Sequence, residues 1–273
     1  MEFIRLTESE FEKFATLIHE MAGIYLKESK ITLLSNRLRK RLKAKEFSNF
    51  DEYYNYLKNS RDAYELDEML NAVSTNETYF FRNVKHYDAL IESIIPDFIE
   101  KRRTPVRIWS AGSSSGEEAF TLAMLLDEKG LLERNLVEIY GTDINTSVLE
   151  EAKKGLFDDK RLRTTPPQYI TRYFKKIDTS LYELDRKIVN SVKFSRLNLK
   201  TDKFDAKYDI IFCRNVMIYF NKEDQEKIVQ KFYDALKNDS YFIIGHSESL
   251  YFIKTGFKYI KISDAPLYYK GNW

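Results

Sequence analysis

The stretch VRIWSAGSSSGEEAFTLAMLL, residues 106–126, decides the fold of this chain. It is a short apolar run, then a turn of glycines and serines, then apolar residues at helical spacing, so it predicts a strand, a tight turn and a helix. Similar runs and amphipathic helical segments alternate downstream. The expected strands are 137–143, 208–213 and 240–245, and the expected helices are 146–154 and 223–236. This alternation predicts an α/β domain built on a mostly parallel sheet with crossover helices.

Two further patterns complete the C-terminal part. FKYIKI (257–262) and PLYYKG (266–271) predict a closing antiparallel hairpin at the edge of the sheet. The segment 182–198 alternates β-branched with charged residues and fits the strand–helix alternation poorly. We therefore expect a small antiparallel β-subdomain inserted at about residues 180–197.

The first 75 residues predict helices and no strand. Thr7 and Glu10 form the pattern of a capping box, and Gly23 is placed to end the helix that follows. Further helices are expected at 28–45, 50–57 and 63–73, with a joining helix at 85–103. The expected parts are an all-helical N-terminal domain (1–75), a linker with the joining helix (76–104) and the α/β domain (105–273).

Bulk composition excludes several classes of protein. With 44 basic and 42 acidic side chains the formal charge is +2, so overall electrostatics select no particular partner. One cysteine excludes an internal disulfide, and with only three histidines we expect no metal site. The sequence has no recognisable signal peptide and no apolar run of ~18 residues, so we expect a cytoplasmic protein without membrane insertion.

The turn within the opening stretch is the first candidate binding site. In an open α/β sheet, ligands bind beyond the carboxyl ends of the strands, where this turn lies. Gly112 allows the tight turn, and the serines leave room for a ligand. The spacing matches neither a dinucleotide fingerprint nor a phosphate-binding P-loop. Glu117 and Glu118 at the helix start would repel a pyrophosphate and suit a cationic ligand, which disfavours NAD and ATP.

Two other strand ends carry polar residues. Asp143 ends the second strand, where a carboxylate can accept hydrogen bonds from both hydroxyls of a ribose or can cap the following helix. Arg214 and Asn215 follow the strand 208–213, and burying them without a ligand would require other partners. Together with the turn, these residues favour a nucleoside-type ligand.

Five motifs follow one another along the chain. They are NETYFFRN (76–83), RIWSAGSSSGEEAFTLAMLL (107–126), GTDINTSVLEEAKKG (141–155), FCRNVMIYF (212–220) and GHSESL (245–250). In this order they resemble the CheR family of chemotaxis receptor methyltransferases. The resemblance implies a Rossmann-like methyltransferase domain with a small β-subdomain, joined to an all-helical N-terminal domain. It implies methyl transfer from S-adenosylmethionine to glutamate carboxylates on chemoreceptor cytoplasmic helices, for sensory adaptation, with S-adenosylhomocysteine as the product.

The resemblance also implies roles for single residues. Arg82 and Tyr219 would face the reacting centre. Arg82 could orient the substrate carboxylate through its planar guanidinium, and Tyr219 could donate a hydrogen bond to that carboxylate or pack beside the sulfonium. The expected cofactor-binding residues are Asn76, Thr78, Arg82, Gly112, Glu117 or Glu118, Asp143, Asn198, Leu199, Arg214 and Asn215.

This reaction requires no strong base. A glutamate carboxyl with a pKa near ~4.3 is ionised at neutral pH, so alignment of the two reactants can supply much of the catalysis. GHSESL contains Ser, His and Glu, but adjacent residues in one turn cannot form a hydrolase triad. We interpret it as a strand end followed by a hydrogen-bonded turn near the pocket.

The stretch 29–45 is basic and contains no acid. Residues 1–75 nevertheless carry twelve basic and thirteen acidic side chains, so the domain is not basic overall and nucleic acid is not an expected partner. We expect a monomer that docks on an acidic helical surface of the receptor through Arg37, Arg39, Lys40, Arg41 and Lys43. Family members that tether themselves to a C-terminal receptor pentapeptide carry a glycine-containing loop in the β-subdomain. The expected insert has no glycine, so we do not expect tethering.

Two other functions remain open at this point. One is a methyltransferase of the same fold that acts on a small molecule or a nucleic acid. The other is a signalling module that binds S-adenosylmethionine or its product without catalysis. The sequence identifies neither the receptor nor the glutamates that would be modified.

Overall fold

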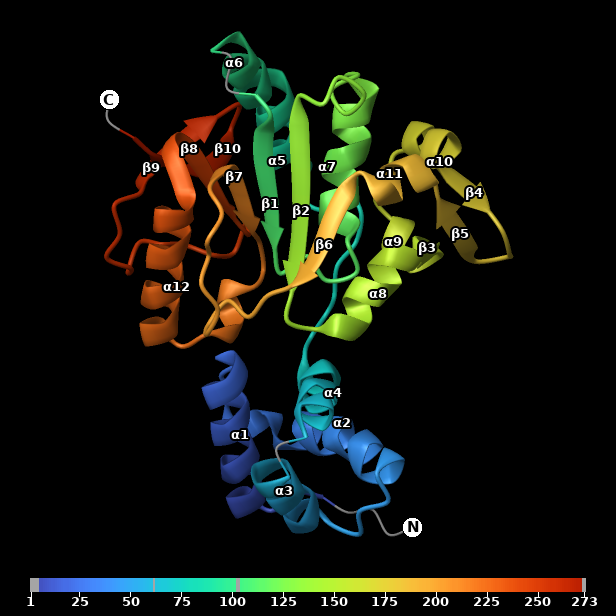
Figure 1. The fold of residues 1–273 in the computed structure, drawn as a ribbon, viewed down its shortest axis with the longest axis vertical. Coiled ribbons are helices and arrows are strands. Elements are labelled where there is room, and N and C mark those ends of the chain that lie inside the picture. The colour runs from blue at the N-terminus through green and yellow to red at the C-terminus, as the bar shows by residue number, and fades with distance from the viewer. Residues whose placement is uncertain (1–4, 61, 102–103, 272–273) are drawn as a thin grey trace.

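The computed structural model describes residues 5–60, 62–101 and 104–271. A helical unit lies at the bottom of Figure 1 and an α/β unit above it. The helical unit contains α1 (Glu8–Ala22), η1 (Glu28–Lys30), α2 (Ile31–Ala44), α3 (Phe50–Asn59) and α4 (Ala63–Val73). Thr7 and Glu10 form the expected capping box, and Gly23 ends α1 in the left-handed conformation. Among the described residues before 105, none forms a strand, so the all-helical character of this part is confirmed.

The main sheet of the described chain has seven strands in the order β6-β2-β1-β7-β8-β10-β9. They are β1 (Val106–Ala111), β2 (Val137–Asp143), β6 (Val192–Arg196), β7 (Tyr208–Cys213), β8 (Leu236–Ile244), β9 (Lys258–Ile262) and β10 (Ala265–Lys270). Strands β6, β2, β1, β7 and β8 pair in parallel, whereas β10 pairs antiparallel with both β8 and β9. The mostly parallel sheet with a closing antiparallel hairpin is thus confirmed.

Helices cover both faces of this sheet. On one face, α7 (Glu117–Glu128) and α8 (Thr146–Lys154) pack against β1, β2 and β6, and on the other α12 (Lys222–Ala235) packs against β8. Successive residues of β1 therefore enter different cores: Ile108 enters the first, and Trp109 enters the second. A strand buried on both faces is apolar throughout, which is why the run at 106–111 was recognisable in the sequence. The carboxyl ends of β1, β2 and β7 point toward the helical unit (Figure 1).

The second sheet differs from the expectation. Its strands are β3 (Leu156–Asp158), β4 (Phe174–Lys176) and β5 (Leu181–Leu184), paired antiparallel in the order β3-β5-β4. Two short helices, α9 (Asp159–Leu162) and α10 (Pro167–Tyr173), lie between β3 and β4. A small antiparallel sheet exists, but the limits of about 180–197 are wrong.

The strand β6 explains the error in those limits. It follows a short helix, α11 (Arg186–Asn190), and pairs in parallel with β2 at the edge of the main sheet. An edge strand is only partly covered, so its side chains alternate between apolar and polar. This period of two is also the pattern of a solvent-facing antiparallel strand, and the sequence alone does not separate the two cases.

The expected joining helix at 85–103 is observed as three segments in succession. They are α5 (Val84–Ala89), the π-helical η2 (Leu90–Ile94) and α6 (Ile95–Glu100). Residues 102 and 103 lie outside the described residues. No helix of the described ranges is long and apolar enough to cross a membrane. The division of the chain at residues 75 and 104 remains a proposal.

Direct hydrogen bonds fix the helical unit against the strand ends. The Asn198 side-chain amide donates to the Met21 carbonyl at 2.7 Å, and the Tyr25 backbone N–H donates to the Tyr219 carbonyl at 2.7 Å. On the other side, Asn71 near the end of α4 donates to the Thr146 hydroxyl at 3.0 Å. These contacts enclose the space between the two units.

Candidate cofactor and substrate site

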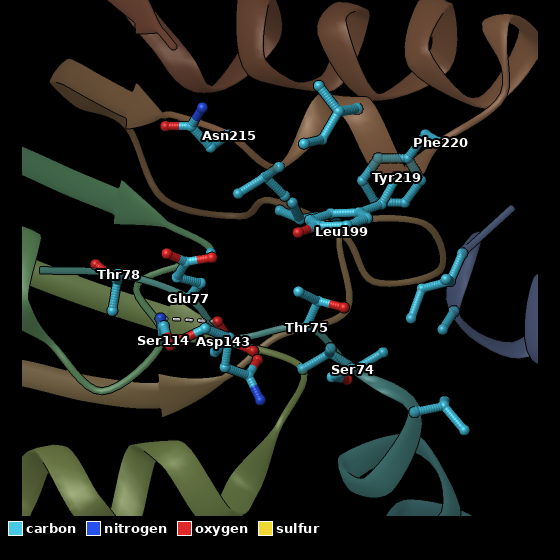
Figure 2. A pocket seen from close by; sticks show the side chains of 18 of the residues that line it. Ser74, Thr75, Glu77, Thr78, Ser114, Asp143, Leu199, Asn215, Tyr219 and Phe220 are labelled. Atoms are coloured by element: carbon cyan, nitrogen blue, oxygen red, sulfur yellow. Dashed lines mark hydrogen bonds between the residues drawn. The ribbon is translucent and has the colours of Figure 1, made fainter. Parts of the chain in front are cut away.

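A cavity of about 710 Å³ lies between the helical unit and the carboxyl ends of β1, β2 and β7. Figure 2 shows side chains from both units facing it. All but one of the residues expected to bind a cofactor line it. These are Asn76, Thr78, Arg82, Gly112, Glu118, Asp143, Asn198, Leu199, Arg214 and Asn215. The exception is Glu117, and the expected catalytic Tyr219 lines the same cavity.

Asp143 and the turn after β1 form the first part of the site. One carboxylate oxygen of Asp143 accepts the backbone N–H of Ser114 at 2.8 Å, drawn in Figure 2, and the other accepts that of Asn145 at 2.9 Å. Burial raises the pKa of Asp143, and these backbone N–H groups oppose that shift. Each oxygen keeps a second lone pair, so the carboxylate can still accept two hydroxyl groups. Asn145, and not Asp143, is the N-cap of α8.

Gly112 makes this turn possible. It has a φ of +76°, which side-chain-bearing residues rarely adopt, and a Cβ there would lie 2.4 Å from a methyl group of Val216. Its backbone N–H and that of Ser113 both donate to the Thr142 carbonyl at 2.8 Å, which joins the ends of β1 and β2. The turn is therefore held close to Asp143 by the sheet itself.

The two glutamates at the start of α7 have different roles. Glu118 faces the cavity, accepts the Ser110 hydroxyl at 2.7 Å and lies 3.3 Å from Nε of Arg214. Glu117 points away from the cavity and pairs with Arg161 at 3.1 Å. Burial raises the pKa of Glu117 to about 7, although Arg161 opposes this shift. The expectation that Glu117 binds the cofactor is therefore wrong, and Glu118 remains the candidate.

Arg214 and Asn215 lie at the end of β7. Arg214 is only 7% exposed; besides its ion pair with Glu118, it donates to the backbone carbonyl of Arg82 and lies 5.2 Å from the Tyr87 ring. Its Nη1 atom, like Oδ1 of Asn215, is buried without a hydrogen-bond partner in the described chain. Buried polar groups normally find partners, so these two atoms indicate a ligand.

Glu248 holds this strand end in place, a role that sequence reasoning missed. It lies in the GHSESL segment and accepts the backbone N–H groups of Asn215 at 2.7 Å, Ile218 at 3.3 Å and Gly245 at 2.7 Å. The interpretation of GHSESL as a strand end with a hydrogen-bonded turn is confirmed, since the N–H of Glu248 donates to the Gly245 carbonyl at 3.0 Å. The sequence signal for the role of Glu248 is the motif itself, because two of its three partners, Asn215 and Ile218, lie 33 and 30 residues away.

The linker at 76–83 forms another wall. The Asn76 carbonyl accepts the Ser114 hydroxyl at 3.2 Å, and the Thr78 carbonyl accepts Nη1 of Arg161 at 3.0 Å. Arg161, which sequence reasoning also missed, thus connects the linker to the buried Glu117. Arg82 lies at the cavity with its guanidinium 5.4 Å from the Tyr79 ring, in a segment where Phe81 has a positive φ of 56°.

Asn198 and Leu199 are placed differently from each other. The side-chain nitrogen of Asn198 donates to the Met21 carbonyl, and the side-chain oxygen of Asn198 accepts the backbone N–H of Lys200 at 3.0 Å. Asn198 therefore joins the two units and offers the cavity little hydrogen-bonding capacity. Leu199 is 6% exposed and provides an apolar wall (Figure 2), which suits the flat face of a nucleobase.

Tyr219 interacts with residues of the helical unit and of the linker. Burial raises its pKa, whereas the Thr75 side chain and the guanidinium groups of Arg37 and Arg82 act in the opposite direction. Its hydroxyl is therefore protonated at neutral pH and can donate a hydrogen bond. Arg37 also donates to Thr75 at 3.0 Å, so it lies at the cavity wall as well as on the basic helix.

The basic helix α2 is not a uniform cationic face. Arg41 is held inside the helical unit by Glu65 and Glu68, with contacts of 2.6–3.0 Å, and its side chain is 16% exposed. The expectation that Arg41 docks on a receptor is therefore wrong. Lys40 and Lys43 are exposed, and Arg39 bonds to Asn36 one turn earlier.

The site fits a sulfonium nucleoside that carries an amino acid group. Asp143 offers acceptors to two ribose hydroxyls, and Leu199 offers an apolar wall to a base. Glu118 and Arg214 present opposite charges side by side, and such a pair can bind both the ammonium and the carboxylate of an amino acid. The unpartnered Nη1 of Arg214 is available for that carboxylate.

Comparisons with known proteins agree on one family. A family model described as "CheR methyltransferase, SAM binding domain" matches residues 76–265, and one described as "CheR methyltransferase, all-alpha domain" matches residues 9–74. The chain is 40% identical over 257 residues to the chemotaxis protein methyltransferase of Borreliella burgdorferi, which covers 90% of both chains. It is 33% identical over 276 residues to chemotaxis protein methyltransferase 2 of Vibrio cholerae (99% and 96% covered). It is also 33% identical over 253 residues to the chemotaxis protein methyltransferase of Escherichia coli, and this match covers 91% of the chain and 87% of the relative.

Proposed function

The chain belongs to the CheR methyltransferase family, with S-adenosylmethionine as its methyl donor, and from this premise we propose that it esterifies glutamate side chains of chemoreceptors. One observation carries the proposal: Arg82 and Tyr219 line the same cavity as Asp143 and the Glu118–Arg214 pair. Residues suited to a carboxylate and residues suited to a charged nucleoside thus face one cavity. Methylation of this kind would serve sensory adaptation in chemotaxis.

The cofactor half of the cavity would bind S-adenosylmethionine through groups that are already positioned. Asp143 would accept the ribose hydroxyls, and Leu199 would contact the base. Glu118 and Arg214 would hold the amino acid group. When bound, the cofactor would supply an electrophilic methyl group. An oxygen of the substrate carboxylate would form a bond to the methyl carbon while the bond between that carbon and sulfur breaks. The electron pair of the broken bond would remain on sulfur.

The substrate half would align the carboxylate. Arg82 is half-buried and its guanidinium is held beside Tyr79, so it can bind a carboxylate without a large loss of side-chain entropy. Tyr219 can donate one hydrogen bond from a protonated hydroxyl. Light contacts are sufficient, because tight binding of the ground-state carboxylate would reduce its nucleophilicity. No general base is needed, since the carboxylate is already ionised at neutral pH.

The proposed receptor-docking set on α2 is smaller than the expected one, because Arg41 is excluded from it. Lys40 and Lys43 are exposed and can approach acidic side chains of a receptor helix, while Arg37 lies nearer the cavity. We propose these residues, together with Arg39, as the docking set. They would attract an acidic helix mainly through long-range electrostatics, which raises the association rate more than the affinity.

We further propose a cytoplasmic monomer that does not tether itself to a receptor pentapeptide. The small sheet lies at 156–184, and this whole range contains no glycine. The corrected limits therefore leave the argument against tethering unchanged. Calorimetry with a C-terminal receptor pentapeptide should detect no micromolar binding, and such binding would contradict this proposal.

Labelled methyl transfer tests the proposed activity. The protein is incubated with S-adenosylmethionine carrying a radioactive methyl group and with a chemoreceptor cytoplasmic fragment. Label on the fragment should be released as methanol by mild base, as a carboxyl methyl ester requires, and a fragment with its glutamates replaced by alanine should stay unlabelled. Arg82→Ala should reduce the rate about a hundredfold while the protein still binds S-adenosylhomocysteine.

Two results would contradict the proposal. Base-stable label, or label on a nucleic acid instead of the receptor, would indicate another acceptor. Binding of the cofactor by calorimetry with no turnover on any receptor fragment would indicate a sensing module without catalysis.

A further inference from the structure

The loop between β8 and β9 displays two aromatic side chains to solvent. Tyr251 is 84% exposed and Phe252 is 76% exposed, and their rings meet edge to face with centroids 4.9 Å apart. They are the two most exposed large hydrophobic side chains of the described chain. Isolated exposed hydrophobic residues are common, but two adjacent aromatics held in contact with each other form a small patch.

The loop is anchored on both sides of the two aromatics. Leu250 and Ile253 are 4% and 8% exposed, and the backbone N–H of Leu250 donates to the Tyr268 hydroxyl at 3.0 Å. Further along, Gly256 packs closely against the Tyr233 ring on α12. Tyr251 and Phe252 are therefore presented on a fixed backbone, and a partner that binds them would not have to order the loop first.

The loop is continuous with the rim of the cavity. Glu248, three residues before Tyr251, binds the backbone N–H groups of Asn215 and Ile218. Ile218 lines the cavity and is itself 56% exposed, so it lies at the opening. A substrate segment that enters the cavity past Ile218 would extend over the loop.

The charge of the loop selects the kind of partner. The loop between β8 and β9 (245–257) contains one lysine, Lys254, and one acid, Glu248, whose carboxylate accepts the backbone N–H groups described above. Two more lysines, Lys258 and Lys261, follow on β9. All three lysines are exposed. An aromatic pair followed in the chain by three exposed cations complements a partner that is apolar on one side and acidic around it. A helix that carries glutamates next to an apolar stripe has this character.

We propose that Tyr251, Phe252 and Lys254 form a docking surface for the glutamate-bearing helix of the substrate, on the methyltransferase unit and across the opening from α2. This surface rests on the proposed function, because its partner is the segment that is methylated. The aromatic rings bury apolar area against the substrate helix, and Lys254 lies near its acidic residues. The two surfaces together would hold the helix on both sides of the cavity and fix which glutamate reaches Arg82.

Two other occupants fit less well. Membrane binding by aromatic and basic residues generally uses a longer amphipathic helix, whereas this patch has two rings on an irregular loop. A second copy of the chain would bring the same three lysines against each other if the contact were symmetric. The substrate helix avoids both difficulties.

The test compares a double variant with a matched control. The double variant Tyr251→Ser/Phe252→Ser removes the patch. The control, Tyr64→Ser, removes another exposed aromatic side chain (71%), at the start of α4. This end of α4 is remote from Asn71, which contacts Thr146 at the other end of the helix. Binding of a fluorescent chemoreceptor cytoplasmic fragment is measured by anisotropy with S-adenosylhomocysteine present, and the KM for the fragment is measured separately. The double variant should bind about tenfold more weakly and raise the KM similarly, with kcat and affinity for S-adenosylhomocysteine unchanged. Tyr64→Ser should match the wild type.

The outcomes separate this proposal from the proposed function. Unchanged fragment binding in the double variant overturns the docking surface while methylation by the wild type leaves the activity standing. Wild-type protein that binds the fragment without methylating it overturns the activity, and tenfold weaker binding by the double variant still supports the surface. A wild type that does not bind the fragment overturns the surface directly.

Two more measurements address the other occupants. Binding of vesicles made with phosphatidylglycerol, if lost in the double variant while fragment binding is retained, would overturn the proposal in favour of a membrane. Self-association in sedimentation experiments, if lost in the same variant with fragment binding retained, would overturn it in favour of a second copy.

Discussion

The two halves of the cavity differ in how their residues are held. In the cofactor half, Asp143 ends β2 and Arg214 follows β7, and backbone N–H groups and buried partners fix them. In the substrate half, residues of α2 and of the linker reach the cavity from outside the sheet. Strand ends of a parallel sheet converge whatever the side chains are, whereas a helix presents its residues in every direction. Topology therefore determines the first half, and packing between the units determines the second.

Replacing Asp143 by alanine should have the largest effect on the cofactor half. It removes the acceptor for two ribose hydroxyls and leaves the backbone N–H of Ser114 without its partner. Hydrogen bonds to a charged group contribute ~1.5–3 kcal/mol each, so affinity for S-adenosylhomocysteine should fall at least about a hundredfold by calorimetry. Asp178→Ala, at an exposed turn, is the control. An affinity within threefold of the wild type would show that Asp143 is structural only.

Arg41→Met should separate packing from docking in the substrate half. It removes the guanidinium bonded to Glu65, a fully buried carboxylate, and leaves it with Lys45 at 3.9 Å, so the free energy of unfolding should fall by about 3 kcal/mol in urea titrations. Lys40→Met, one residue earlier and exposed, should leave stability within ~0.5 kcal/mol of the wild type. Lys40→Met should instead raise the KM for a receptor fragment, more strongly at low salt. Equal stabilities of the two variants would restore Arg41 to the docking surface.

Glu117→Gln should expose a dependence of stability on pH. The pKa of Glu117 rises from 4.5 to about 7 on folding because the carboxyl is buried. The folded protein therefore holds this proton more tightly than the unfolded chain, and ionisation costs stability as pH rises from about 4.5 to about 7. The free energy of unfolding of the variant relative to the wild type should increase by roughly 2–3 kcal/mol between pH 4.5 and pH 8. A flat difference across this range would mean that Arg161 keeps Glu117 ionised at no cost.

The same contrast explains what could be predicted from the sequence. Strands β1, β2 and β7 and the polar residues after them were identified because each is a short apolar run with an abrupt end. The limits of the small sheet were wrong because β6, an edge strand, has the alternation of an antiparallel strand.

Individual side chains were harder to place than strands. Glu117 and Glu118 are adjacent on α7, and only the packing of Arg161 against one and Arg214 against the other separates them. Arg41 appeared cationic and exposed because its partner Glu65 lies 24 residues away. Long-range pairing of this kind leaves no local signal in one sequence.

Tyr219 lies where the two halves meet, and Tyr219→Phe should give the smallest effect. The hydroxyl is protonated at neutral pH because burial raises its pKa, so it can donate one hydrogen bond to the substrate carboxylate. A hydrogen bond to a charged carboxylate contributes ~1.5–3 kcal/mol, but only the part that is retained in the transition state affects kcat. We therefore expect kcat to fall about three- to tenfold, with affinity for S-adenosylhomocysteine unchanged. Tyr25→Phe, at a half-exposed residue of the same cavity, should leave kcat unchanged. If Tyr219→Phe also retains full kcat, the ring and not the hydroxyl of Tyr219 acts in catalysis, and the residue belongs to the cofactor half beside the sulfonium.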